Sequence, residues 1–198
     1  VALSTAQWDA LSTAQIAGLK PTQIAVMETA DLVAIGADGV ASFSPTQLAA
    51  LTTAQLGVVD LSTFSSAKIL ALKSQQLIAL TTAQWDAFTT AQIAALNAAQ
   101  IGAIETQDLA VFDSNDIRAL NSVQLGSLKP AQLIAMSTAQ WDALSTTQLA
   151  SLKSTQIAVM ETQDLAVFSP DDLKVFTATQ LSALTTAQIV ALSTAQWD

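Results

Sequence analysis

A repeat of eight residues runs through almost the whole chain and limits its folding more than any other feature. The frame starts at Ser4, continues to Val59, resumes at Ser65 and runs to Asp198, so that only residues 60–64 fall outside it. We call each repeat an octad and number its positions from one to eight. Position five is apolar in all 24 octads and position eight in all 23 complete ones, while position four is Gln in 17 and Asp in five. Such self-similarity is typical of repeat architectures.

A longer period lies above the octad. Residues 4–59, 81–136 and 137–192 are three blocks of 56 residues that align octad by octad, and residues 60–80 form an insertion between the first two. We therefore expect one continuous repeat array over residues 1–198. The nine residues Val1–Asp9 recur as Val190–Asp198, which leads us to expect that the array continues in a longer chain or in stacked subunits.

Each octad carries the signals that start a short helix. Position one is Ser, Thr, Asn or Asp in 16 of the 24 octads, and Ser/Thr-x-x-Gln is the capping-box pattern. All four prolines, Pro21, Pro45, Pro130 and Pro170, stand at position two, the first helical residue, where a missing N–H costs nothing. The apolar residues at positions eight and five then form a hydrophobic staple across each cap. The sequence predicts an all-α solenoid or fibre with one short capped helix per octad.

Two other folds compete with this one. In a continuous helix, an eight-residue apolar period would drift by about 80° per octad, so the stripe would wind around the helix. A β-solenoid is the alternative fold, favoured by the Thr and Ile content but disfavoured by Ala, Gln and the prolines at position two. The glutamines at position four have two possible roles: capping, or side-chain hydrogen-bond ladders between stacked octads.

Composition excludes several functions. The chain has no His and no Cys, and it also lacks Tyr, so common catalytic bases, thiolates and nitrogen or sulfur metal ligands are missing. We do not expect an enzyme. Seven basic residues and a net charge of -9 disfavour nucleic-acid binding. Polar residues interrupt every apolar run, so no membrane span is expected.

The acidic residues cluster in the fourth and fifth octads of each block. Their oxygen atoms are the ligands that Ca²⁺ prefers, although a solvated acidic face is the simpler interpretation. The candidate calcium ligands are Glu105, Asp108, Asp113, Asp116, Glu161, Asp164, Asp171 and Asp172. No other cofactor is expected.

Four tryptophans, Trp8, Trp85, Trp141 and Trp197, occupy position five. The other octads have Ile, Leu or Val there, so we expect these rings to be large packing residues. The alternative is an aromatic platform for carbohydrate or for lateral contact between fibres.

The recurring unit Leu-Ser/Thr-Thr-Ala-Gln-Ile/Leu-x-Ala resembles octapeptide arrays of very large bacterial secreted or cell-surface proteins of the adhesin type. This resemblance implies an extracellular or cell-surface location and a structural role. We accordingly expect a self-associating fibre, surface scaffold or adhesin stalk, in the biofilm matrix or on the cell envelope, with a possible carbohydrate or cell-surface partner. The alternative is a binding solenoid whose acidic or tryptophan-bearing face recognises a ligand.

Overall fold

A computed structural model describes residues 3–197 of the chain, with the side chain of Trp197 excepted. In that range it contains 24 short helices, one for each octad, and no strand. The predicted all-α repeat fold is therefore confirmed, and the β-solenoid alternative is wrong. Val1, Ala2 and Asp198, which belong to the matching ends of the sequence, lie outside the described residues. The chain divides into two compact segments, residues 1–96 and residues 97–198.

The N-terminal segment contains α1 (Thr5–Asp9), α2 (Thr13–Ala17), α3 (Pro21–Ile24), α4 (Thr29–Ala34), α5 (Gly36–Ala41), α6 (Pro45–Leu48), α7 (Thr53–Leu56), α8 (Ser66–Leu70), α9 (Ser74–Ile78), α10 (Thr82–Asp86) and α11 (Thr90–Ala95). The C-terminal segment contains α12 (Ala98–Ile101), α13 (Thr106–Leu109), α14 (Ser114–Ala119), α15 (Ser122–Leu125), α16 (Pro130–Ile134), α17 (Thr138–Asp142), α18 (Thr146–Ser151), α19 (Ser154–Ile157), α20 (Thr162–Leu165), α21 (Pro170–Lys174), α22 (Ala178–Ser182), α23 (Thr186–Ala191) and α24 (Thr194–Trp197).

The helices begin where the capping pattern predicts. Ser12, for example, is extended (φ −71°, ψ 155°), its hydroxyl accepts from the Gln15 N–H, and its own N–H donates to Gln15 Oε1 at 2.8 Å. The four prolines are the first residues of α3, α6, α16 and α21. At α5 the corner is made differently, because Gly36 has φ +66° and the helix starts at position one. Any residue other than glycine would be strained in this left-handed backbone conformation.

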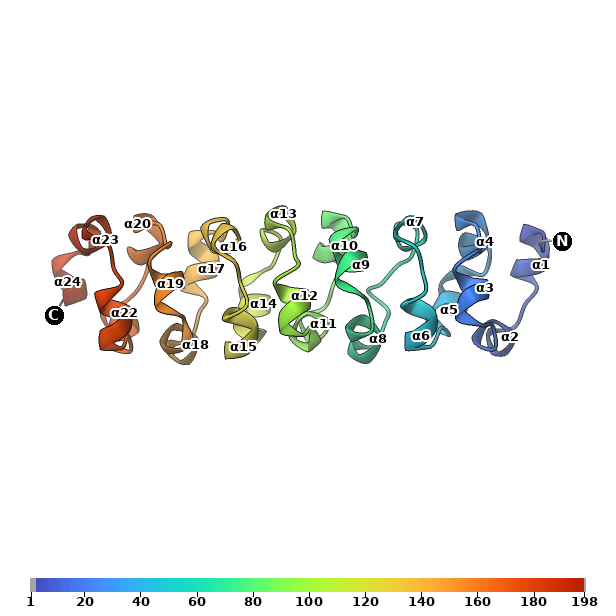
Figure 1. Ribbon diagram of the computed structural model, residues 1–198, viewed down its shortest axis with the longest axis horizontal. Coiled ribbons are helices and arrows are strands. Elements are labelled where there is room, and N and C mark those ends of the chain that lie inside the picture. Colours follow the sequence, from blue (N-terminus) through green and yellow to red (C-terminus); the bar gives the residue numbers. More distant parts are fainter. Residues whose placement is uncertain (1–2, 198) are drawn as a thin grey trace. The chain divides into compact units, whose positions relative to one another are not determined.

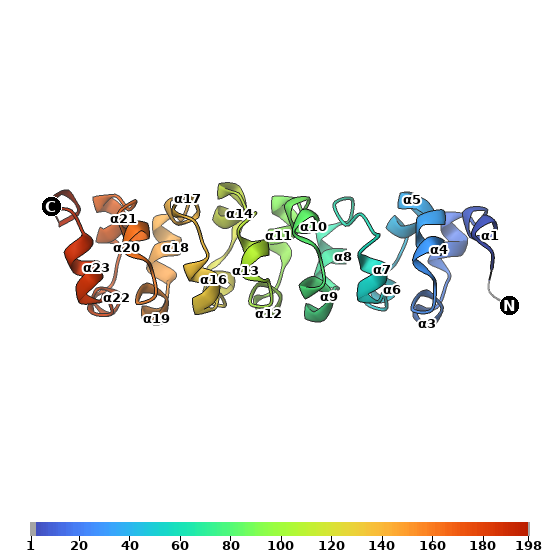
Figure 2. The same ribbon diagram turned by 90° about the horizontal axis from the view of Figure 1, so that it is seen from above.

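Within each segment the helices wind into a solenoid whose turn takes between three and four octads. Helices three apart contact each other, as in α1 with α4 and α12 with α15. Figure 1 shows the consequence in the C-terminal segment, where α13, α16, α20 and α23 follow one another along one edge, with steps of three, four and three helices. The seven octads of a 56-residue block therefore make two turns in total. The view from above, in Figure 2, shows the same succession of short helices and sharp corners within each segment.

The core of each segment consists of positions five and eight. Ile24, Leu48 and Phe43 are fully buried, and so are Leu149 and Ile157 in the C-terminal segment. Helices this short are unstable alone, because helix nucleation is unfavourable. Each one is therefore held by packing against the turns before and after it.

Residues 60–64, which fall outside the octad frame of the sequence, follow part of the same plan. They form a truncated octad that keeps positions four to eight and lacks the cap and the two residues after it. Leu61 and Phe64 are buried at 2% and 5% exposure, as positions five and eight are elsewhere. Gln92 donates to the carbonyls of both, 31 and 28 residues back. Residues 65–80 are two ordinary octads, which form α8 and α9.

The first prediction concerns the buried glutamines. Replacing Gln140 with Met keeps the volume but removes one acceptor and two donated hydrogen bonds, leaving buried backbone groups without partners. We expect the free energy of unfolding to fall by about 2–4 kcal/mol, measured by urea denaturation. Gln163→Met, at an exposed position three of the same segment, is the control and should change stability little. Equal effects of the two substitutions would contradict the assigned role.

Candidate functional site

Position four is the most distinctive chemical feature of the structure, because its glutamine joins two turns. Gln140 accepts the Ser137 N–H through Oε1 at 2.8 Å, which caps its own helix. Its Nε2 donates to the carbonyls of Leu109 and Phe112, both at 2.9 Å. Those carbonyls belong to positions five and eight of the octad four places earlier, at the end of α13. One side chain thus caps the start of one helix and the end of another, where backbone groups lack partners within their helices.

The same arrangement recurs in both segments. Glutamines that donate to carbonyls of the preceding turn are Gln47, Gln55, Gln76, Gln84 and Gln92 in the N-terminal segment and Gln132, Gln140, Gln148, Gln156, Gln180, Gln188 and Gln196 in the C-terminal segment. The sequence predicts the cap. These glutamines do make hydrogen bonds between turns, as the ladder alternative requires. Their acceptors, however, are backbone carbonyls and not other glutamines.

The sequence separation between each glutamine and its acceptor carbonyls is shorter across the truncated octad. Most glutamines reach 28 and 31 residues back, whereas Gln76 and Gln84 reach 25 and 28. The difference equals the three positions that residues 60–64 lack. An acid at position four and apolar residues at positions five and eight were visible in Asp60-Leu61-Ser62-Thr63-Phe64, and this was the signal that would have identified it.

Three other residue types, Asp, Lys and Gly, replace glutamine at position four. Lys68 supplies a longer donor, since its Nζ donates to the Ala41 carbonyl while lying 5.7 Å from the centre of the Phe64 ring. Asp164 can cap but cannot donate when ionised. Its Oδ2 accepts the Glu161 N–H at 3.2 Å, while Oδ1 is buried without a hydrogen-bond partner. Burial raises the pKa of the Asp164 carboxyl; the hydrogen bond from the Glu161 N–H opposes this rise and the Glu161 charge adds to it.

The candidate calcium ligands are not brought together. Among the described residues, no group of three or more acidic side chains could hold a metal ion. The physical reason is that each acid serves its own helix. Asp116 and Asp172 at position four accept the N–H groups of Asp113 and Ser169, and Asp108 occupies the same position in its octad. The predicted set Glu105, Asp108, Asp113, Asp116, Glu161, Asp164, Asp171 and Asp172 is therefore not one site.

The remaining acids of this set are exposed. Glu105 and Glu161, at position one, accept from the Nε2 groups of Gln107 and Gln163 at 3.0 and 2.7 Å. Asp171 lies 3.7 Å from Lys174. Asp113 accepts the N–H groups of Asp116 and Asn115, and the first of these hydrogen bonds is the main reason that its pKa is lowered. These contacts stabilise helix starts and leave a solvated acidic surface.

The three tryptophans whose side chains are described are buried. Trp8, Trp85 and Trp141 are 8%, 1% and 0% exposed. Trp141 meets Phe168 edge to face at 6.4 Å between ring centres, and Trp85 meets Phe88 at 5.0 Å. The side chain of Trp197 lies outside the described residues. Trp85 and Trp141 have almost no accessible face for a ligand, whereas Trp8 borders an open groove.

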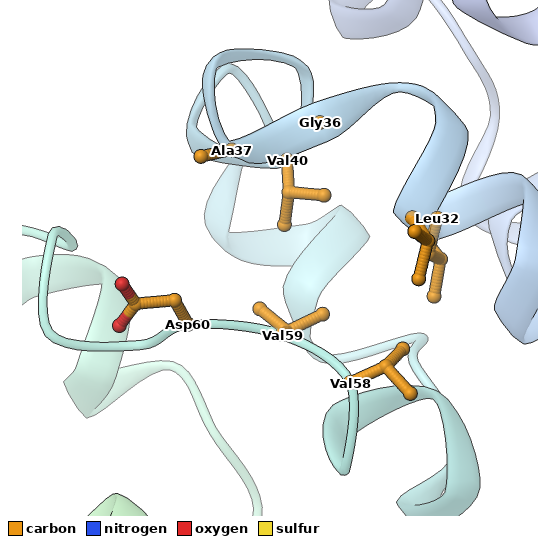
Figure 3. A pocket seen from close by; sticks show the side chains of 8 residues that line it. Leu32, Gly36, Ala37, Val40, Val58, Val59 and Asp60 are labelled. Carbon is orange, nitrogen blue, oxygen red and sulfur yellow. The ribbon is translucent and has the colours of Figure 1, made fainter.

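An open pocket lies where the truncated octad interrupts the N-terminal segment. It is lined by Leu32, Val33, Gly36, Ala37, Val40, Val58, Val59 and Asp60. Figure 3 shows Val40, Val58 and Leu32 around the space, with the Asp60 carboxylate at its edge and turned away from the valines. Asp60 instead accepts the Ser62 hydroxyl at 2.6 Å, the main cause of its lowered pKa. The side chains around the pocket are therefore apolar apart from Asp60.

Within residues 3–197, no helix is long and apolar enough to cross a membrane. The described helices span four to six residues each.

The second prediction concerns Asp164. Replacing it with Gln restores a donor toward the preceding turn and removes a buried charge, so we expect the free energy of unfolding at pH 7 to rise by about 1–3 kcal/mol. The folded-state pKa of Asp164 is raised above its ordinary value of 3.8. Folding of the wild type therefore takes up a proton at pH values between 3.8 and the folded-state pKa. The wild type should therefore recover stability as the pH falls through the folded pKa towards 3.8.

The measurement is urea denaturation of both proteins between pH 7 and pH 3. The control is Asp171→Asn, which removes an equal charge from an exposed site. A gain for the Asp164→Gln protein that is the same at every pH would contradict the role of the buried carboxylate.

The third prediction concerns calcium. Because the acids are dispersed, we expect neither Ca²⁺ nor a chelator to change the melting temperature, measured by circular dichroism. A saturable rise in melting temperature on adding Ca²⁺, with Mg²⁺ as the control ion, would show that the acids gather around a metal after all.

Comparison with known proteins identifies the repeat. The sequence profile of the ALTTAQ repeat matches residues 1–27, 24–59, 101–138 and 157–194. The hexapeptide Ala-Leu-Thr-Thr-Ala-Gln occurs at residues 50–55, 79–84 and 183–188, where it spans positions seven and eight of one octad and one to four of the next. No curated protein sequence matches the chain significantly.

Proposed function

The chain belongs to the ALTTAQ repeat family, and we propose that it serves as a structural scaffold, a self-associating extracellular fibre or the stalk of a surface adhesin. The observation that carries the proposal is that the position-four glutamine repeatedly makes hydrogen bonds both to its own helix start and to the preceding turn. Each added octad provides the same cap, the same donor and the same two core residues. Such an array can be lengthened without a new kind of contact, as in other quasi-one-dimensional proteins.

The composition supports a mechanical or spacing role. The buried glutamines and the three described tryptophans lie in the interior, where they pack or make hydrogen bonds between turns. The net charge of -9 favours solubility at high local concentration. The extracellular or cell-surface location is proposed from the resemblance of the octad to arrays in secreted and surface proteins.

A second candidate function is a binding solenoid with an acidic face. Glu105, Glu161 and Asp171 are exposed, and the first two occupy equivalent places in their 56-residue blocks. A periodic row of carboxylates suits a cationic partner. Trp85 and Trp141, which are 1% and 0% exposed, offer no surface for this function.

The fourth prediction separates the two functions. We expect electron microscopy of the purified chain to show filaments with an axial period related to the 56-residue block, because the same contacts recur every two turns. Small-angle scattering over a range of concentrations should show particles that lengthen without thickening. Uniform single particles at every concentration, together with saturable binding of a cationic peptide, would favour the binding function instead.

A further inference from the structure

The open pocket of the N-terminal segment lies where a glutamine side chain joins two turns elsewhere. Asp60 is position four of the truncated octad, and it follows Leu32 and Ile35, positions five and eight of the α4 octad, by 28 and 25 residues. Gln76 bridges two turns across the same separations. Asp60 instead turns away from the valines (Figure 3), and its Oδ1 accepts the N–H and the hydroxyl of Ser62 at 3.0 and 2.6 Å. The space that a bridging side chain would fill is therefore open.

The pocket is apolar and small. The buried side chains of Leu32, Val40 and Val59 line it, together with Val33 and Val58, which are 64% and 46% exposed. Its volume is about 190 Å³, below the ~300–1,000 Å³ of sites that enclose a drug-sized molecule. The space therefore suits one aliphatic or aromatic side chain and not a whole cofactor.

The part of the chain that forms the pocket carries acids and no base. Residues 21–67 include every residue that lines the pocket and contain neither Lys nor Arg. The acids in this range are Glu28, Asp31, Asp38 and Asp60. Asp60 is exposed, and the hydrogen bond from the Ser62 hydroxyl is the main reason that its pKa is lowered, so the carboxylate is charged at neutral pH. Its Oδ2 makes no hydrogen bond among the described residues, and a cation from a partner would be its complement.

We propose that this pocket is a docking site for a peptide segment of another protein that presents one large apolar side chain next to a Lys or Arg. The apolar side chain enters the space beside Leu32, Val40 and Val59, and the cation lies against the Asp60 carboxylate. Burial of this anchor supplies most of the affinity, as at the centres of other interfaces. The charge pair fixes the orientation of the segment. The inference goes beyond the structural role and does not depend on it, since a chain can carry this site whether or not it self-associates.

The fifth prediction tests the chemistry of the partner. The probe is the fluorescein-labelled peptide Gly-Ser-Lys-Phe-Lys-Ser-Gly, titrated with the full chain and followed by fluorescence anisotropy. We expect saturable binding. Replacing the Phe of the probe with Ser should weaken binding at least about tenfold, because the burial of an aromatic side chain is lost. Replacing both Lys residues of the probe with Glu should abolish binding, because the acids then repel it.

Substitutions in the chain locate the site. Val58→Lys places a cation beside the pocket and should weaken binding of the Phe probe at least about tenfold. Ile78→Lys is its matched control, since Ile78 is 44% exposed in the same segment. Asp60→Asn keeps the oxygen that accepts from Ser62 and removes the charge, so it should weaken binding about threefold, and less at high salt. Its control is Asp86→Asn, at an exposed acid of the same segment. Circular dichroism establishes that each variant is folded.

The outcomes decide between this occupant and others. Probe binding that is unchanged by Val58→Lys and Asp60→Asn would place the peptide elsewhere and overturn the inference. A Ser probe that binds as tightly as the Phe probe would show attraction to the acidic surface alone, and would also overturn it. Reduced self-association of the Val58→Lys protein, with no probe bound by the wild type, would identify a second copy as the occupant. If probes with Phe, Leu or Ile all fail to bind, the docking site is wrong, and the structural role, which is measured by filament formation, is unaffected.

Discussion

The structure depends on one side chain that bonds in two directions. A helix of four to six residues has nearly all its N–H and C=O groups in its first and last turns, where no partner exists within the helix. The glutamine at position four supplies an acceptor to the start of its own helix and donors to the end of a helix one turn earlier. Its length is what joins the two tasks, because the amide reaches both sets of groups from one backbone position.

This double role explains which substitutions the array tolerates. Lysine at residue 68 keeps the donor, so Ala41 in the preceding turn still has a partner. Aspartate keeps the cap and loses the donor, and at Asp164 the result is a buried oxygen without a hydrogen bond and a raised pKa. At Gly39 neither function remains, but a Cβ there would lie 3.0 Å from Ile16 Cδ1 and from Ile35 Cβ. Close packing replaces the polar contact at that point.

The local part of this fold could be predicted from the sequence and the long-range part could not. Cap, proline and apolar positions act within one octad, so Ser12, Gln15 and Pro21 were enough to place helix starts. The partners of Gln140 lie 28 and 31 residues away, and nothing in one octad gives the number of octads in a turn. The prediction of a calcium site from the acidic residues has the same weakness. Their clustering along the chain suggested a calcium site, but consecutive octads direct their side chains to different corners of the turn.

The truncated octad shows which positions the solenoid requires. Residues 60–64 have no cap, no first helical residue and no helix, yet Leu61 and Phe64 are buried and their carbonyls accept from Gln92. The array therefore continues through a unit that keeps only its core residues and its acceptors. Helix formation within an octad is the means by which those groups are presented. What must be preserved from one turn to the next is the pair of carbonyls, the pair of apolar side chains and a donor of sufficient length opposite them.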